Sequence, residues 1–86
     1  MLSNEEIQFC SEMVRHKARL LALNGDINPG QVRAELDMEM RYASRNNSLP
    51  EFMKALDNDG VEPCVARGWQ CNDDECASCR GTGVRL

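Results

Sequence analysis

Four of the five cysteines of this chain fall within sixteen consecutive residues: Cys64, Cys71, Cys76 and Cys79. The last two belong to a C-x-x-C-x-G-x-G run whose glycines are Gly81 and Gly83. A C-x-x-C turn can bring two thiolates to one metal ion, and a glycine soon after it lets the backbone turn back with a positive φ. Aromatic residues make up only 5% of the chain, so a bound metal would supply folding free energy that packing in this segment does not.

The four cysteines predict a structural zinc site. Structural zinc takes four tetrahedral ligands, so we expect Zn²⁺ on all four thiolates, with an iron–sulfur cluster as the alternative metal group. Four protein ligands leave no open position, which favours a protein that is not an enzyme. Free thiols, or a redox-active pair of Cys76 and Cys79, stay open as interpretations without a metal. Cys10 or the single histidine, His16, could also take the place of one ligand.

The charge and hydropathy of the chain argue against two classes of partner. Ten basic and fourteen acidic side chains give a net charge of −4, with the two signs interspersed. This lacks the basic surface that grips a phosphate backbone, so nucleic acid is a disfavoured partner. No run approaches the ~20 apolar residues that span a bilayer, and we read no signal peptide. Clustered cysteines without an export signal read as metal ligands in a reducing compartment, so we expect a cytoplasmic protein with no membrane contact.

Residues 3–23 predict an amphipathic helix. Ser3 and Glu6 form a capping box, in which each side chain can bond the other residue's backbone amide. Apolar residues then recur at steps of three and four: Ile7, Cys10, Val14, Ala18 and Leu21. Gly25 is a stop signal that ends the helix near Leu23.

A second helix is predicted to begin after Asn28 and to end near Arg45. Asn28 and Gln31 repeat the capping box. The apolar stripe consists of Val32, Leu36, Met40 and Ala43. Met38 and Tyr42 lie beside this stripe. The charged side chains are expected largely away from it: Glu35, Asp37, Glu39 and Arg41.

Ser48 is predicted to cap a third, short helix. Its apolar side consists of Leu49, Phe52, Met53 and Leu56, and the polar turn at residues 57–60 follows it. The predicted fold class is therefore small and all-α, with three short helices followed by an irregular four-cysteine zinc knuckle. We expect a three-helix unit at residues 1–60 and a zinc-binding cysteine-rich module at residues 61–86, which can pack back on the first helix.

One tryptophan stands among arginines in the cysteine-rich segment. Trp69 lies between two predicted ligands, where it could cover the metal site. With Arg67, Arg80 and Arg85 it could instead form a patch that binds a partner, because tryptophan and arginine are enriched at binding hot spots. The methionines of the helices either fill gaps in the core or present an adaptable face to a partner.

The run from Cys76 to Gly83 resembles the repeat unit of the cysteine-rich zinc domain of DnaJ-type chaperones, through Cys76, Cys79, Gly81 and Gly83. The resemblance implies a zinc half-site. It covers eight residues, and the spacing of Cys64 and Cys71 departs from a second repeat. A His-Pro-Asp signature of the J-domain does not occur. The helix-plus-knuckle architecture also resembles compact phage and bacterial regulators of transcription.

These patterns favour a small cytosolic adaptor or regulatory protein that acts by protein–protein interaction, encoded by a phage or mobile element, as a monomer or homodimer. The alternative is a nucleic-acid-binding transcriptional regulator, in which the second or third helix is the reader of a helix-turn-helix. The acidic side chains of the second helix count against that alternative. A thiol oxidoreductase that works through Cys76 and Cys79 ranks third.

Overall fold

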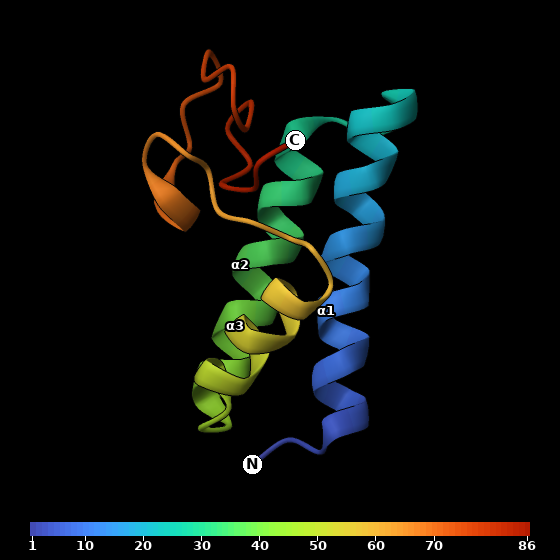
Figure 1. The fold of residues 1–86 in the computed structure, drawn as a ribbon, viewed down its shortest axis with the longest axis vertical. Coiled ribbons are helices and arrows are strands. Elements are labelled where there is room, and N and C mark those ends of the chain that lie inside the picture. The colour runs from blue at the N-terminus through green and yellow to red at the C-terminus, as the bar shows by residue number, and fades with distance from the viewer.

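The computed structural model describes all 86 residues, apart from the side chain of Asn24. Along this described chain the α-helices are α1 (Asn4–Arg19), α2 (Pro29–Arg45) and α3 (Leu49–Asn58). α1 continues into the π-helical turn η1 (Leu20–Asn24), and the 3-10 turn η2 (Gly68–Gln70) lies in the C-terminal segment. α1 and α2 run antiparallel, α3 lies across them, and the C-terminal segment returns to the end of the hairpin where α2 begins (Figure 1). The predicted small helical fold is confirmed.

The first two helices begin at the predicted capping boxes. The Ser3 hydroxyl accepts from the Glu6 amide at 3.2 Å, and the Asn28 side chain accepts from the Gln31 amide at 3.0 Å. Both reciprocal bonds are also made. The first helix ends at Gly25, whose φ of 66° suits the left-handed region. The N–H of this glycine donates to the Leu20 carbonyl five residues back, which makes the last turn a π-turn.

Ser48 does not cap α3 with its side chain, so that prediction is wrong. Its hydroxyl instead accepts from the backbone amide of Leu2 at 2.9 Å and donates to the Asn46 carbonyl at 3.1 Å. Pro50 lies at the second helical position, so one of the amides that a cap would satisfy is missing. The fully buried Ser48 therefore ties the segment before α1 to the loop between α2 and α3.

Two glutamates that were expected on the solvent side of α2 are buried. Glu35 is 3% and Glu39 7% exposed. α1 lies against this side of α2, and its Lys17 ammonium pairs with the Glu35 carboxylate at 2.7 Å. The second Glu35 carboxylate oxygen is buried and has no hydrogen-bond partner among the described atoms. Glu35 and Glu39 are thus part of the interface between α1 and α2.

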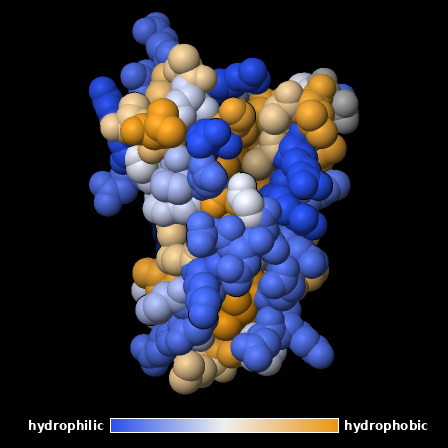
Figure 2. All heavy atoms as spheres, viewed as in Figure 1, coloured by the Kyte–Doolittle hydropathy of each residue, from blue (hydrophilic) through white to orange (hydrophobic). Residues whose placement is uncertain are grey.

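The helices and the C-terminal segment share one hydrophobic core. Its largest fully buried apolar side chains come from all three helices: Val14, Val32, Leu36, Phe52 and Leu56. Val61 and Val84 from the C-terminal segment belong to the same cluster. Hydrophilic residues cover much of the lower part of the face on which α3 lies, while hydrophobic atoms gather at the upper right over η1 (Figure 2). None of the described helices is both long and apolar enough to cross a membrane.

Candidate metal centre

The four clustered cysteines converge on one point. The sulfurs of Cys64, Cys71, Cys76 and Cys79 all lie within 4.8 Å of one another. The sulfurs of Cys64 and Cys76 are 3.6 Å apart. A tetrahedron of sulfurs at 2.3 Å from a metal ion has edges of about 3.8 Å, so the observed separation is close to that of ligands on one ion. Three of the cysteines are buried and Cys76 is partly buried, so this group is a candidate metal site.

Two similar turns present the sulfurs. The amide of Gly68 donates to the Cys64 carbonyl at 2.8 Å, and the amide of Arg80 donates to the Cys76 carbonyl at 2.8 Å. Each turn therefore closes four residues after a cysteine, and Gly68 and Arg80 both have positive φ, at 73° and 54°. The second turn carries the C-x-x-C pair, whereas Arg67 stands in the first turn where a paired cysteine would be. Cys71 supplies the fourth sulfur from beyond the first turn.

Backbone amides prepare Cys64 for metal binding. The Arg67 amide, and after it the Ala66 amide, lower the pKa of the Cys64 thiol to about 6, although burial opposes them. The thiolate is the form that binds a metal ion. The Asp73 amide acts likewise on Cys71, but the contact with the Cys79 thiol and burial outweigh it and raise the pKa of Cys71 to about 12. Of these two thiols, Cys64 is therefore the one that loses its proton more readily.

Residues after the C-x-x-C turn close the segment on itself. The Thr82 amide and hydroxyl both donate to the Cys79 carbonyl, at 3.0 and 2.7 Å. The same hydroxyl accepts from the Val84 amide at 3.0 Å. The Cys64 amide donates to the Gly83 carbonyl at 3.1 Å, which joins the first and second turns. These bonds hold the backbone at Cys64 and Cys79 in place.

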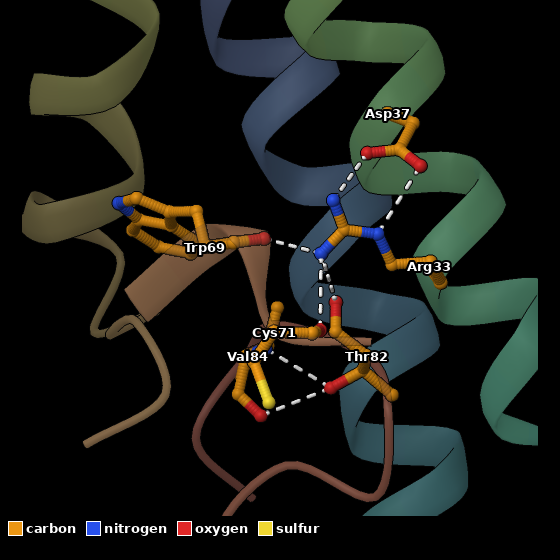
Figure 3. Close-up of polar contacts among 6 residues, drawn as sticks. All are labelled: Arg33, Asp37, Trp69, Cys71, Thr82 and Val84. Atoms are coloured by element: carbon orange, nitrogen blue, oxygen red, sulfur yellow. Dashed lines mark hydrogen bonds and ion pairs between the residues drawn. The ribbon is translucent and has the colours of Figure 1, made fainter. Parts of the chain in front are cut away.

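Arg33 of α2 attaches this segment to the helices (Figure 3). One guanidinium nitrogen donates to the carbonyl of Trp69, and reaches the carbonyls of Cys71 and Thr82 at 3.3 and 3.4 Å. The other two nitrogens donate to both carboxylate oxygens of Asp37, at 2.7 and 3.1 Å. Asp37 thereby orients a cation that binds three carbonyls from both sides of the C-x-x-C turn.

Gly83 allows this close approach. Its φ is 78°, and a Cβ built on it would collide with the Arg33 guanidinium and the Trp69 carbonyl. Gly81 has a φ of 86°, and its Cβ would lie 2.9 Å from an Asp74 side-chain oxygen. Both glycines of the C-x-x-C-x-G-x-G run thus have a steric reason in this fold.

The four residues of the predicted partner patch differ in burial and in the contacts that they make. Trp69 is partly buried and packs against the helical core. Arg85 pairs with the Glu62 carboxylate at 2.6 Å. Arg67 and Arg80 are exposed. A partner-binding role for these four residues stays a prediction.

The two candidate replacement ligands lie outside the sulfur group. Cys10 is buried in the helical core, and His16 is exposed on α1. Sequence reasoning missed Arg33 altogether. Its spacing from Asp37 is a visible i,i+4 pair, but a contact with carbonyls 36 to 49 residues away leaves no local pattern. Comparisons with protein-family models, curated proteins and solved structures found no match.

Proposed function

We propose that this protein is a small zinc-stabilised adaptor or regulator that works in the reducing cytosol by binding another protein. The four convergent cysteine sulfurs are the observation that carries the proposal. Thiolates are soft ligands that suit zinc, and the Cys64–Cys76 separation fits one tetrahedral ion. In an iron–sulfur cluster at least some of the four cysteines bind different irons, so their sulfurs lie farther apart than the 4.8 Å that contains all four here. Zinc therefore fits this group best.

The proposed zinc is structural. Four protein ligands leave no coordination position for a substrate or a reactive water. The metal then holds the C-terminal segment rigid, and residues on the surface of the molecule carry out the proposed binding. Large apolar side chains are exposed on the helices, among them Phe9 at 62% and Met38 at 55%. Exposed apolar groups that lie together favour contact with another protein.

The helix-turn-helix alternative ranks second. The burial of Glu35 and Glu39 weakens one objection to it, because these carboxylates would not face a phosphate backbone. The net charge of −4 still opposes nucleic-acid binding. The oxidoreductase alternative ranks third, because a pair of cysteines that shares one ion with two further thiolates is not free to exchange disulfides.

Native mass spectrometry tests the zinc part of the proposal. We expect one zinc per chain, lost after treatment with a strong chelator. Cys79→Ser should lose the metal, whereas the matched variant Cys10→Ala should keep it, because Cys10 lies outside the sulfur group. A purified protein without metal, or one with the visible absorption of an iron–sulfur cluster, would contradict the assignment.

Capture from a cell lysate tests the binding part. The zinc-loaded protein should retain specific partners that the chelator-treated protein does not. Arg67→Ala combined with Arg80→Ala alters only exposed side chains of the predicted patch, whereas Trp69→Ala also removes packing against the core. If the zinc-loaded protein captures nothing beyond the control, the adaptor function is wrong.

A further inference from the structure

A groove of about 640 Å³ opens between the first half of α1 and the second half of α2. Its apolar wall consists of Phe9, Met38 and Tyr42, which are 62%, 55% and 38% exposed. The neighbouring side of α1 is already used, because Ser11 donates to Asp59 after α3 at 2.6 Å. The groove thus lies along the flank of the hairpin that α3 leaves open.

Two buried polar side chains form the floor of this groove. Cys10 and Glu39 both line it, and they are 4% and 7% exposed. Burial, and then the charge of Glu39, raise the pKa of the Cys10 thiol to about 11, so the thiol keeps its proton beside the carboxyl group. The nearby Lys17 ammonium is paired with Glu35 instead. A carboxyl group shielded from water at the base of a groove is a site that gains from an incoming cation.

The rim of the groove is predominantly acidic. Glu5 and Glu6 lie on the α1 side, and Glu6 also accepts from the Tyr42 hydroxyl at 3.4 Å. Arg45 is the basic residue of the lining. With Glu39, the lining has three carboxyl groups and one guanidinium group. The aromatic faces of Phe9 and Tyr42 add sites for a cation, because aromatic rings attract ammonium and guanidinium groups.

We propose that this groove docks a segment of a partner protein whose apolar side chains are flanked by lysine or arginine. The assignment rests on the proposed adaptor function and names the surface and partner chemistry that it uses. The lining spans about two helical turns on each helix, or about 10 Å, which suits two or three turns of an amphipathic helix. Apolar anchors lie against Met38 and Phe9, and a basic side chain reaches the acidic rim and floor.

A second copy of this chain fits the groove less well than a basic segment. A symmetric dimer through this face would bring Glu5 and Glu6 of both copies into one interface. Each copy carries a net charge of −4, so the long-range force between two copies is repulsive. A basic partner is attracted by the same charges.

Fluorescence anisotropy with two designed peptides tests this assignment. The probe is a labelled peptide of about 14 residues in which leucine, alanine and lysine form an amphipathic helix, and its control has glutamate at every lysine. The zinc-loaded protein should bind the lysine peptide at least about tenfold more tightly than the glutamate peptide. Phe9→Ser and Met38→Ser should each weaken that binding about tenfold, which is the usual cost of losing an anchor. Leu23→Ser is the matched control, because Leu23 is 77% exposed on η1.

Equal affinity for both peptides, or no binding of either one, would overturn the assignment. A wild-type dimer in sedimentation that Phe9→Ser converts to monomers would also overturn it, because a second copy would then be the occupant. If the peptide fails to bind while Phe9→Ser still captures the cellular partners, the groove assignment fails and the adaptor function stands. If the peptide binds selectively but no cellular partner is captured, the groove chemistry stands and the adaptor function fails.

Discussion

At the scale of single residues, Glu39 between α1 and α2 links the stability of the protein to pH. Glu39 is buried beside Glu35, and it lines the same groove as the Cys10 thiol. Burial, and then the charge of Glu35, raise the pKa of Glu39 above its ordinary value of 4.5. Helical periodicity placed both glutamates away from the apolar stripe. It missed their burial because the lysine that pairs with Glu35 comes from another helix, 18 positions earlier in the chain.

Replacing Glu39 by glutamine should stabilise the protein at neutral pH. A raised pKa in the folded state stabilises the protein below pH 4.5, and this contribution is lost as the pH rises through the raised value. Glutamine has nearly the same shape as glutamate and stays uncharged, so the variant does not lose this contribution as the pH rises. Thermal unfolding should give Glu39→Gln a melting temperature above wild type by roughly a few degrees at pH 7, and a smaller difference at pH 4. The exposed Glu12→Gln is the control for general effects of acid, and a difference that is the same at both pH values would contradict the prediction.

Replacing Gly83 by alanine should cost more than the strain of its backbone. Gly60 offers a matched control, because its φ of 79° equals that of Gly83 within a degree while its Cβ would meet nothing within 4 Å. Gly60→Ala should cost about 1 kcal/mol from the positive φ alone. Gly83→Ala adds a collision with Arg33 and Trp69, so urea unfolding should show a loss of at least about 2 kcal/mol. Equal costs would show that the close approach around Gly83 does not limit stability.

At the scale of elements, local signals located the helices and long-range contacts attached them to the cysteine segment. The capping boxes at Ser3 and Asn28 predicted the starts of α1 and α2, because the bonds involved join residues three positions apart. Ser48 carries the same type of side chain, but Leu2, 46 positions away, takes its hydroxyl. Arg33 is likewise explained only by carbonyls far along the chain. The hydrogen-bond partners of Ser48 and Arg33 are brought close by the packing of distant segments, so the neighbouring residues in the sequence do not reveal them.

Arg33→Gln should loosen the cysteine segment from α2. Glutamine is shorter than arginine and lacks the guanidinium fork that bonds Asp37 and the cysteine segment together. A charged donor to buried carbonyls contributes about 1.5–3 kcal/mol, so urea unfolding should show a loss in that range. Zinc competition should show an affinity at least about tenfold lower, as for other groups that orient metal ligands. Arg41→Gln, at an exposed position of the same helix, should change neither measurement, and an Arg33→Gln variant that matches it would contradict the proposed role.

At the scale of the whole molecule, helices and sulfur cluster form a continuous structure. Val61 and Val84 pack in the same core as Val14 and Phe52, and Arg33 adds the polar connection. The sequence predicted the three helices and the convergence of the four cysteines. It also expected that the cysteine-rich segment can pack on the first helix. It did not identify Val61 and Val84 as core residues, because isolated valines in a glycine-rich segment show no helical or strand period. The small size of the chain makes such sharing valuable, since short domains bury a modest fraction of their surface.

Removing the metal should therefore destabilise the helices as well as the cysteine segment. Structural zinc contributes on the order of 10 kcal/mol in small zinc domains, and about 1 kcal/mol shifts the melting temperature of a domain this size by about 4–8 °C. Circular dichroism at helical wavelengths should show a melting temperature at least about 10 °C lower with chelator than with zinc. The Cys79→Ser variant should melt at the lower temperature with or without chelator. If neither chelator nor Cys79→Ser alters the helical melting curve, the helices and the cysteine segment unfold independently.

The participation of Val61 and Val84 in the helical core also bears on how the protein is dissected. A fragment truncated at Gly60 would keep every α-helix but would lack Val61 and Val84, so part of the helical core would be exposed. Such a fragment should self-associate or bind chaperones. The proteins captured with it would then bind the exposed core and not the native surface.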